Sequence, residues 1–205
     1  MSAATDPTDL VVDYLKQWRF DPYNPGHTLR SKNSFGHSGR NYNLRNRRTR
    51  TFLQWERQTW GINLGWTDDG TPQTATKVSR WFLRRPGTNA SALKYGERLA
   101  LGYGGDPSFL RYSKRTVGIN LKWDYSPSYE WRLLGGRKNR PVLTGEPVAI
   151  YNETAGERGF LIHFDRTAGG DIGWPDSQTW LDQLPGILAK AFKEHYKEAA
   201  AFLLA

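Results

Sequence analysis

A tryptophan and a hydrogen-bonding residue three positions before it recur at three points in this chain of 205 residues. An exposed indole offers a flat apolar face that can stack on a sugar ring or a nucleobase. The amide or carboxylate beside it can exchange hydrogen bonds with ligand hydroxyls. The alternative is that the tryptophans cap a barrel while the polar side chains bond the backbone of a turn. The candidate ligand-binding residues are Trp66 with Asn63, Trp123 with Asn120, and Trp174 with Asp171.

The chain is strongly basic, with a formal net charge of +9 and an isoelectric point of about 9.8. Such a charge attracts anionic surfaces, nucleic acid or acidic glycans through the field of the whole protein. Positive charge is densest between residues 40 and 50, where five arginines could bind phosphates or could form a solvated loop face. This candidate anion-binding set is Arg40, Arg45, Arg47, Arg48 and Arg50.

Signals for catalysis or for a metal centre are weak. The 4 histidines are far apart, and no two have the spacing of metal ligands. His163 and Asp165 alternate along one strand face, which is more typical of a solvated pair than of a catalytic one. Cysteine is absent, so disulfides and thiolate metal sites are excluded. We therefore expect no catalytic residue, no metal and no cofactor.

The repeated tryptophans belong to a longer unit that occurs three times without a gap, at residues 52–66, 109–123 and 160–174. Each copy begins with Phe-Leu, carries a Thr seven residues later and a Gly two residues after that, and ends on Trp. We interpret the Thr-x-Gly segment as a tight turn between two strands, in which glycine supplies a positive φ angle. The turn glycines are Gly61, Gly118 and Gly169.

Two further elements recur in the same order. A Gly-led segment precedes each Phe-Leu pair, at residues 39–44, 96–101 and 145–150, and a second tryptophan series precedes that segment. The members of this series are Trp18, Trp81, Trp131 and Trp180.

Each unit therefore offers about four short strands, and three units give about twelve. One unit cannot bury its apolar face alone, so three are needed to close a core. We expect an all-β fold, a pseudo-threefold β-trefoil, in a domain of residues 1–181 with repeats at 18–80, 81–130 and 131–179. The expected core layers include Leu53, Leu110 and Leu161.

The repeated unit, with its W-x-L, G-E-x-V-A and F-L motifs, resembles the β-trefoil units of fascin-like and agglutinin-type domains over nearly all of residues 14–181. The resemblance implies binding of a protein or a glycan and no catalysis. Ricin-type lectins carry Gln-x-Trp near the end of each repeat, but here only Gln178 and Trp180 match that motif at that position, while the Gln-x-Trp at residues 58–60 is out of register with it. The ricin-type sugar site is therefore not carried over to the other two repeats.

Both ends of the chain lie outside the repeat. Residues 10–20 fit helical spacing and strand alternation equally, although their end matches the strand at Trp131. Residues 182–205 form an expected amphipathic helix, with Asp182 as its N-cap, Pro185 in its first turn and an apolar stripe that ends in Phe202. Because an exposed stripe promotes aggregation, we expect the helix to dock on Leu10, Val11 and Tyr14 or, by preference, on a second subunit or a partner.

Three classes of function remain. The first is a non-catalytic, lectin-like module that binds a glycan or glycoprotein, with a toxin-targeting domain as one form of it. The second is a protein-interaction module or a homo-oligomer that uses the 182–205 helix, and the third is nucleic-acid binding. No signal peptide and no apolar span is evident at the sequence level, so we expect a cytoplasmic protein or one exported without a recognisable signal.

Overall fold

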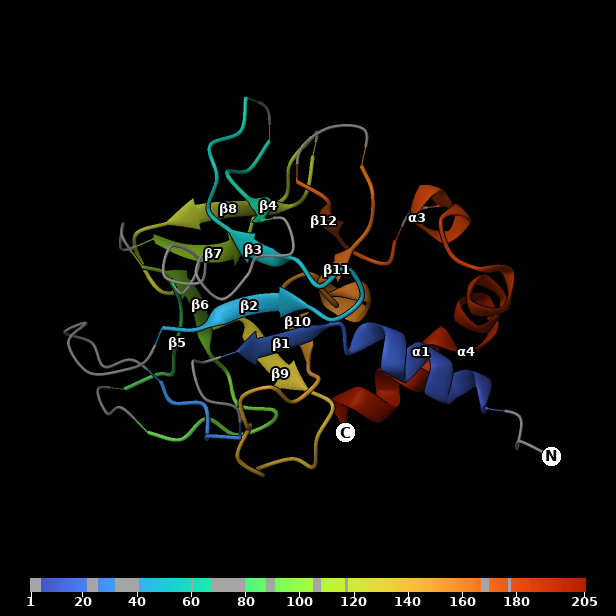
Figure 1. The fold of residues 1–205 in the computed structure, drawn as a ribbon, viewed down its shortest axis with the longest axis horizontal. Coiled ribbons are helices and arrows are strands. Elements are labelled where there is room, and N and C mark those ends of the chain that lie inside the picture. Colours follow the sequence, from blue (N-terminus) through green and yellow to red (C-terminus); the bar gives the residue numbers. More distant parts are fainter. Residues whose placement is uncertain are drawn as a thin grey trace.

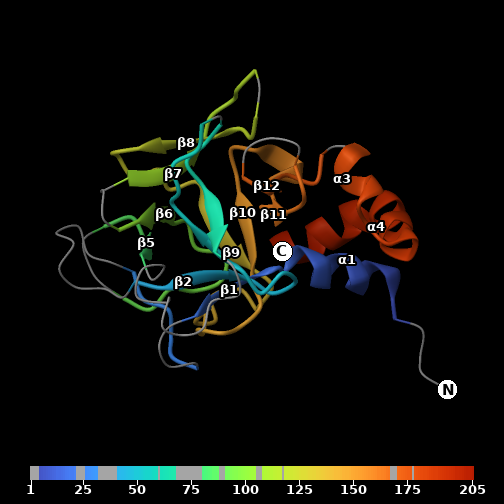
Figure 2. The same ribbon diagram turned by 45° about the horizontal axis from the view of Figure 1, so that its top comes forward.

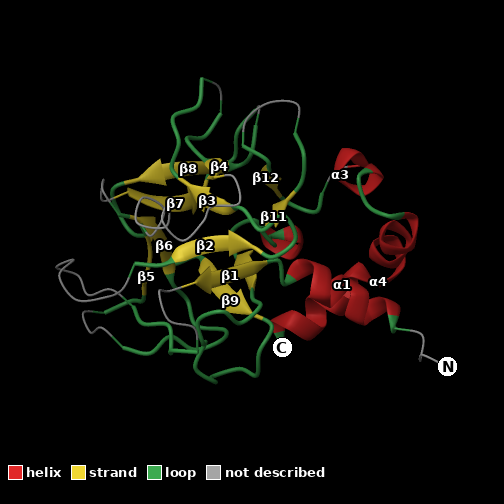
Figure 3. Cartoon of the chain, in the orientation of Figure 1, coloured by secondary structure: helices red, strands yellow, loops and turns green. Residues whose placement is uncertain are grey.

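The computed structural model describes residues 5–21, 26–31, 41–59, 61–67, 80–87, 91–104, 108–116, 118–166, 170–176 and 178–205. The described residues form twelve short strands in four antiparallel sheets, and a long helix lies at the C-terminal end. This arrangement confirms the expected all-β class with an added helix. Figure 3 shows the helices gathered at one side of the strands.

Two of the sheets have four strands each in sequence order, and two are hairpins (Figure 1). The first sheet contains β1 (Trp18–Asp21), β2 (Asn43–Asn46), β3 (Phe52–Gln54) and β4 (Gly65–Thr67). The second contains β5 (Trp81–Arg84), β6 (Ala100–Tyr103), β7 (Ser108–Tyr112) and β8 (Leu121–Asp124). The hairpins pair β9 (Trp131–Leu134) with β10 (Ala149–Asn152), and β11 (Ile162–His163) with β12 (Ile172–Gly173).

The strand register is the same in the three repeated units. Leu53 lies opposite Trp66 in β3–β4, and Leu110 lies opposite Trp123 in β7–β8. Ile162 lies opposite Gly173 in β11–β12, which is the equivalent pairing one position further along. The turns between these strands hold Gly61 at φ 90° and Gly118 at φ 89°, which confirms the predicted positive φ there, while Gly169 lies outside the described residues.

The tryptophans that begin β1, β5 and β9 form the centre of the core. Each is fully buried, and each indole N–H donates to a leucine carbonyl of the preceding unit, so that the three bonds run in a cycle. Burial of an indole N–H without an acceptor costs free energy, so these bonds stabilise the core. The bonds are Trp18 to Leu161 at 2.6 Å, Trp81 to Leu53 at 2.5 Å, and Trp131 to Leu110 at 2.7 Å. The three leucines are themselves fully buried, as predicted.

Isolated β-bridges connect the units to one another. They join Tyr42 to Trp81, Leu99 to Trp131, and Trp18 to Val148. The last of these bridges brings the first unit back against the third. The partners of the tryptophans occupy the same position in each Gly-led segment, so the links between units repeat as the units do.

The ambiguous N-terminal segment contains both a helix and a strand. Helix α1 (Pro7–Leu15) begins with Asp6 as its N-cap, whose carboxylate accepts from the Thr8 N–H at 2.7 Å. Strand β1 follows two residues later. The helix is amphipathic, and Val11, Tyr14 and Leu15 are buried on its inner face.

The C-terminal segment differs from its prediction in three ways. Trp180 and Asp182 lie in a short helix, α3 (Gln178–Asp182), so Trp180 begins no strand and Asp182 caps no long helix. Helix α4 (Gly186–Leu204) begins after Pro185, because proline disfavours helical backbone in the residue before it. Phe202, which was expected on the buried apolar stripe, is exposed, whereas Tyr196, which was not expected there, is buried.

Helix α4 docks within its own chain, against α1 (Figures 1 and 2). Phe192 packs edge-on against Tyr14 and Trp180, with ring centroids 5.1 and 4.7 Å away. The preference for docking on a second subunit is therefore corrected: the apolar stripe is already covered intramolecularly. Ile187 remains 77% exposed on this helix.

Candidate functional site

The repeated tryptophans at the ends of the predicted units pack against the core series. Trp174 is buried, whereas Trp66 and Trp123 are half-buried. One face or edge of each ring is occupied by a core tryptophan, which leaves less of the indole for a ligand than the sequence suggested. The pairs and centroid distances are Trp66 with Trp18 at 5.8 Å, Trp123 with Trp81 at 6.1 Å, and Trp174 with Trp131 at 6.3 Å.

The polar partners of these tryptophans bond the backbone of their own turns. In each unit the side-chain oxygen accepts from the backbone N–H five residues earlier, which is the turn alternative considered above. The acceptors are Asn63 from Gln58 at 3.1 Å, Asn120 from Arg115 at 2.8 Å, and Asp171 from Arg166 at 2.9 Å. Ligand binding at these six positions stays a prediction.

Two arginines of the basic segment attach the turn after β2 to helix α1. Arg47 donates to Asp13 Oδ1 at 3.2 Å, and the guanidinium carbon of Arg48 lies 4.5 Å from the ring centroid of Tyr14. Both cations therefore have structural roles between the sheet and the helix.

The other three arginines of the candidate anion-binding set have different surroundings. Arg45 donates to the Arg50 carbonyl at 3.1 Å and lies over the Phe52 ring, while Arg50 is exposed and Arg40 lies outside the described residues. Anion binding by this set therefore stays a prediction.

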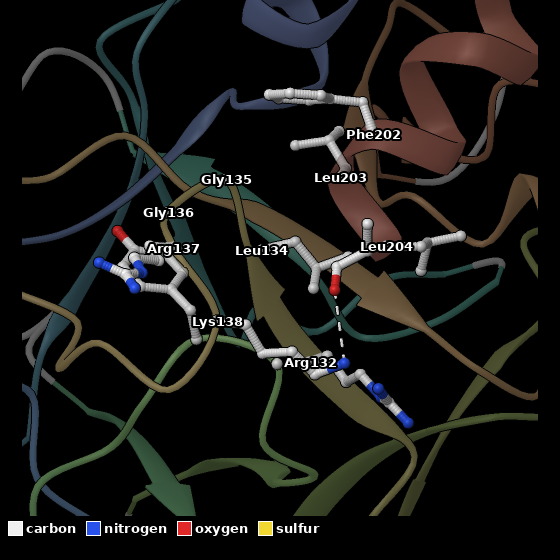
Figure 4. A pocket seen from close by; sticks show the side chains of 12 residues that line it. Arg132, Leu134, Gly135, Gly136, Arg137, Lys138, Phe202, Leu203 and Leu204 are labelled. Atoms are coloured by element: carbon white, nitrogen blue, oxygen red, sulfur yellow. Dashed lines mark hydrogen bonds between the residues drawn. The ribbon is translucent and has the colours of Figure 1, made fainter.

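A pocket of about 510 Å³ lies between β9, the turn that follows it, and the last turns of α4 (Figure 4). Its volume is in the range of small-molecule sites. Leu134 of β9 forms one wall, and Phe202, Leu203 and Leu204 of α4 form the other. The polar part of the lining comes from Arg132, Arg137 and Lys138.

The three cations of the pocket have different partners. Arg132 forms an ion pair with Glu153, and Lys138 Nζ donates to the Ala205 carbonyl at 3.4 Å, the dashed line in Figure 4. The exposed Arg137 guanidinium has no hydrogen-bond or ion-pair partner among the described residues. It is therefore the cation most available to an anion.

The turn that carries Arg137 is held closely against Tyr95. A Cβ on Gly136 would come within 2.4 Å of the Tyr95 ring, so only glycine allows this approach. The Tyr95 hydroxyl donates to Glu146 at 2.8 Å, and Arg140 binds the same carboxylate. Burial, together with Glu146, raises the pKa of Tyr95, so the hydroxyl stays protonated and keeps this bond.

Sequence reasoning missed the pocket because its two walls are far apart in the chain. They meet only when α4 docks, and the docking partner was assigned to a second subunit. The basic turn after Gly135 and Gly136 and the apolar residues at the end of the chain were visible signals, but nothing in their spacing joined them.

Comparison with protein-family models, with curated proteins and with solved structures gives no match for this chain. Among the described residues, no helix has the length and apolar character needed to cross a membrane. The functional argument therefore depends on the chain's own geometry.

Proposed function

We propose that the four sheets form a β-trefoil with repeats at 18–80, 81–130 and 131–179. The shared strand register supports this architecture, and so do the cyclic indole-to-carbonyl bonds of Trp18, Trp81 and Trp131. The bridges between successive units provide independent support. Helices α1 and α4 lie outside these three repeats, and α4 lies beyond the predicted domain limit at residue 181.

We propose that the chain acts as a non-catalytic binding module, and that its ligand is a small anion with an apolar body. The carrying observation is the Arg137 guanidinium, which has no hydrogen-bond or ion-pair partner among the described residues, beside a pocket with apolar walls. An apolar body would lie between Leu134 and the last turn of α4, where burial removes it from water. Its anionic group would face Arg137 and Lys138 and form charge-assisted hydrogen bonds. The basic net charge of the chain favours such a ligand at longer range.

Decanoate is a suitable probe, with 1-decanol as its uncharged match. Titration calorimetry should detect one decanoate site whose affinity falls about tenfold in Arg137→Gln, as expected for loss of a charge-assisted bond. Phe202→Ala should also weaken binding. Ile187→Ala is the control, because this residue is exposed at the opposite end of the same helix. Equal affinities for decanoate in the wild-type and Arg137→Gln chains would refute the proposal.

Glycan binding at the repeated tryptophans is the second candidate. It is favoured by the partial exposure of Trp66 and Trp123 at equivalent positions, although the buried Trp174 reduces the expected sites from three to two. A glycan-array signal that Trp123→Ala abolishes, with the melting transition retained, would support it. A signal that survives both the Trp66→Ala and the Trp123→Ala substitution would count against it.

A further inference from the structure

The third repeat carries three potential metal ligands, and the other two repeats have different residues at all three equivalent positions. In the ungapped alignment, His163 replaces an aromatic residue, Asp165 replaces a cation, and Asp171 replaces an asparagine. The equivalent residues are Trp55, Arg57 and Asn63 in the first repeat, and Tyr112, Lys114 and Asn120 in the second. The other two repeats thus fold without these three side chains, so the repeat itself does not require them.

The fold brings the three side chains together. One ligand atom from each of His163, Asp165 and Asp171 lies within 4.8 Å of the other two. A tetrahedral cation with bonds of about 2.1 Å needs ligand atoms about 3.4 Å apart. Asp165 is exposed, so a side-chain rotation can close that difference without moving the backbone.

Among the described residues, Asp171 uses one carboxylate oxygen to hold its turn, and the other oxygen makes no hydrogen bond. Its Oδ1 accepts the turn bond from Arg166, as Asn120 Oδ1 does from Arg115. In the second repeat the other polar atom, Asn120 Nδ2, approaches the Tyr112 hydroxyl at 3.5 Å. Tyr112 is the equivalent of His163, so the second oxygen of Asp171 corresponds to an atom that faces residue 163.

The other two ligands are positioned through their backbones, so their side chains are left available. The His163 N–H donates to Gln17 Oε1 at 2.9 Å, and Gln17 is itself buried. Gln183, between α3 and α4, accepts from the Asp165 N–H at 2.9 Å and donates to its carbonyl at 2.6 Å. No hydrogen bond to the imidazole of His163 or to the carboxylate of Asp165 occurs among the described residues.

The His163 imidazole is held in place by an aromatic neighbour. Its edge-to-face contact with Trp66, at a centroid distance of 4.9 Å, fixes one side of the ring.

We propose that His163, Asp165 and Asp171 bind one divalent transition-metal cation of the zinc type. One imidazole nitrogen and two carboxylate oxygens match the ligands that Zn²⁺ takes in proteins. The cation leaves at least one position for solvent or a further ligand. It also ties the hairpin β11–β12 to the segment between α3 and α4 through the Gln183 bonds to Asp165. This site does not depend on the anion pocket or on its ligand.

The test is titration calorimetry of the full chain with Zn²⁺ after chelator treatment. Asp171→Asn is the decisive variant, because asparagine occupies this position in the other repeats and keeps the turn bond. We expect one Zn²⁺ per chain, with affinity at least tenfold lower in Asp171→Asn, and an increase in melting temperature with Zn²⁺ that the variant loses. His163→Tyr, which installs the residue of the second repeat, should behave in the same way.

His195 provides the matched control. It lies 3.6 Å from Glu198 and 3.9 Å from Glu194 on α4, and so offers a competing surface site. His195→Ala should leave Zn²⁺ affinity unchanged. Loss of binding in His195→Ala, or undiminished binding in Asp171→Asn, would overturn the proposal, as would the absence of any Zn²⁺ binding by the wild-type chain.

Discussion

Trp131→Phe tests the hydrogen bonds that link the repeats. The substitution removes the indole N–H that donates to the buried Leu110 carbonyl at 2.7 Å, and an orphaned buried acceptor costs about 1–3 kcal/mol. Phenylalanine also lacks two of the buried ring carbons, worth about 1.6 kcal/mol at about 0.8 kcal/mol per carbon. The free energy of unfolding should therefore fall by about 2.6–4.6 kcal/mol.

Urea unfolding followed by circular dichroism measures this change, with an unchanged m value as the sign that only stability is altered. Trp55→Phe is the matched control, because Trp55 is 44% exposed and should change stability by less than about 0.5 kcal/mol. Trp18→Phe and Trp81→Phe should match Trp131→Phe within about 1 kcal/mol, since both lose an equivalent bond. Equal effects of Trp55→Phe and Trp131→Phe would refute the assigned role of the buried indoles.

Two further predictions concern α4 and His163. Phe192→Ala should destabilise the chain by about 3–5 kcal/mol, whereas Phe202→Ala should change it by less than about 0.5 kcal/mol; the reverse order would contradict the docked face of the helix. Because burial lowers the pKa of His163 below 6.5, the unfolded chain binds its proton more readily, so stability should fall as the pH drops through about 6.5. His163→Gln should reduce this fall between about pH 7.5 and pH 5.5, measured as urea midpoints with chelator present, and an identical fall would contradict the assignment.

The structural features predicted correctly from the sequence are those that follow from the threefold repeat. The buried leucines and the positive φ angles of Gly61 and Gly118 follow from a pattern whose copies restrict one another. The exposure of Trp66 could not be predicted in this way, because an alternating strand presents a residue to one face without showing what lies on that face. The predicted limits of α4 were wrong for a local reason. Pro185 was placed inside the helix, but proline disfavours helical backbone at Leu184, the residue before it. Helix α3 therefore ends before this point, and α4 begins after it.

The docking of α4 on its own chain could have been inferred by comparing the outward-facing positions of the repeats. Three such positions hold Leu134, Tyr151 and Ile162 in the third repeat, and all three join the cluster that α1 and α4 cover. The equivalent positions hold Arg84, Gly102 and Arg111 in the second repeat, and Asp21, Arg45 and Gln54 in the first.

A phenylalanine begins each of the three repeated segments, residues 52–66, 109–123 and 160–174. A different group covers this phenylalanine in each repeat. Arg45 lies over Phe52 with its guanidinium carbon 5.3 Å from the ring centroid, and Phe82 packs edge-on against Phe109 at 5.4 Å. Tyr151 of the same repeat packs against Phe160 at a centroid distance of 5.0 Å, and Tyr196 of α4 adds a second contact at 6.4 Å. Among the described residues, the apolar outer face that α1 and α4 cover belongs to the third repeat. Both proposed sites adjoin that face, because the docking of α4 creates the pocket and the segment between α3 and α4 holds Asp165 in place. The function that we propose thus depends on the places where the third repeat departs from the other two.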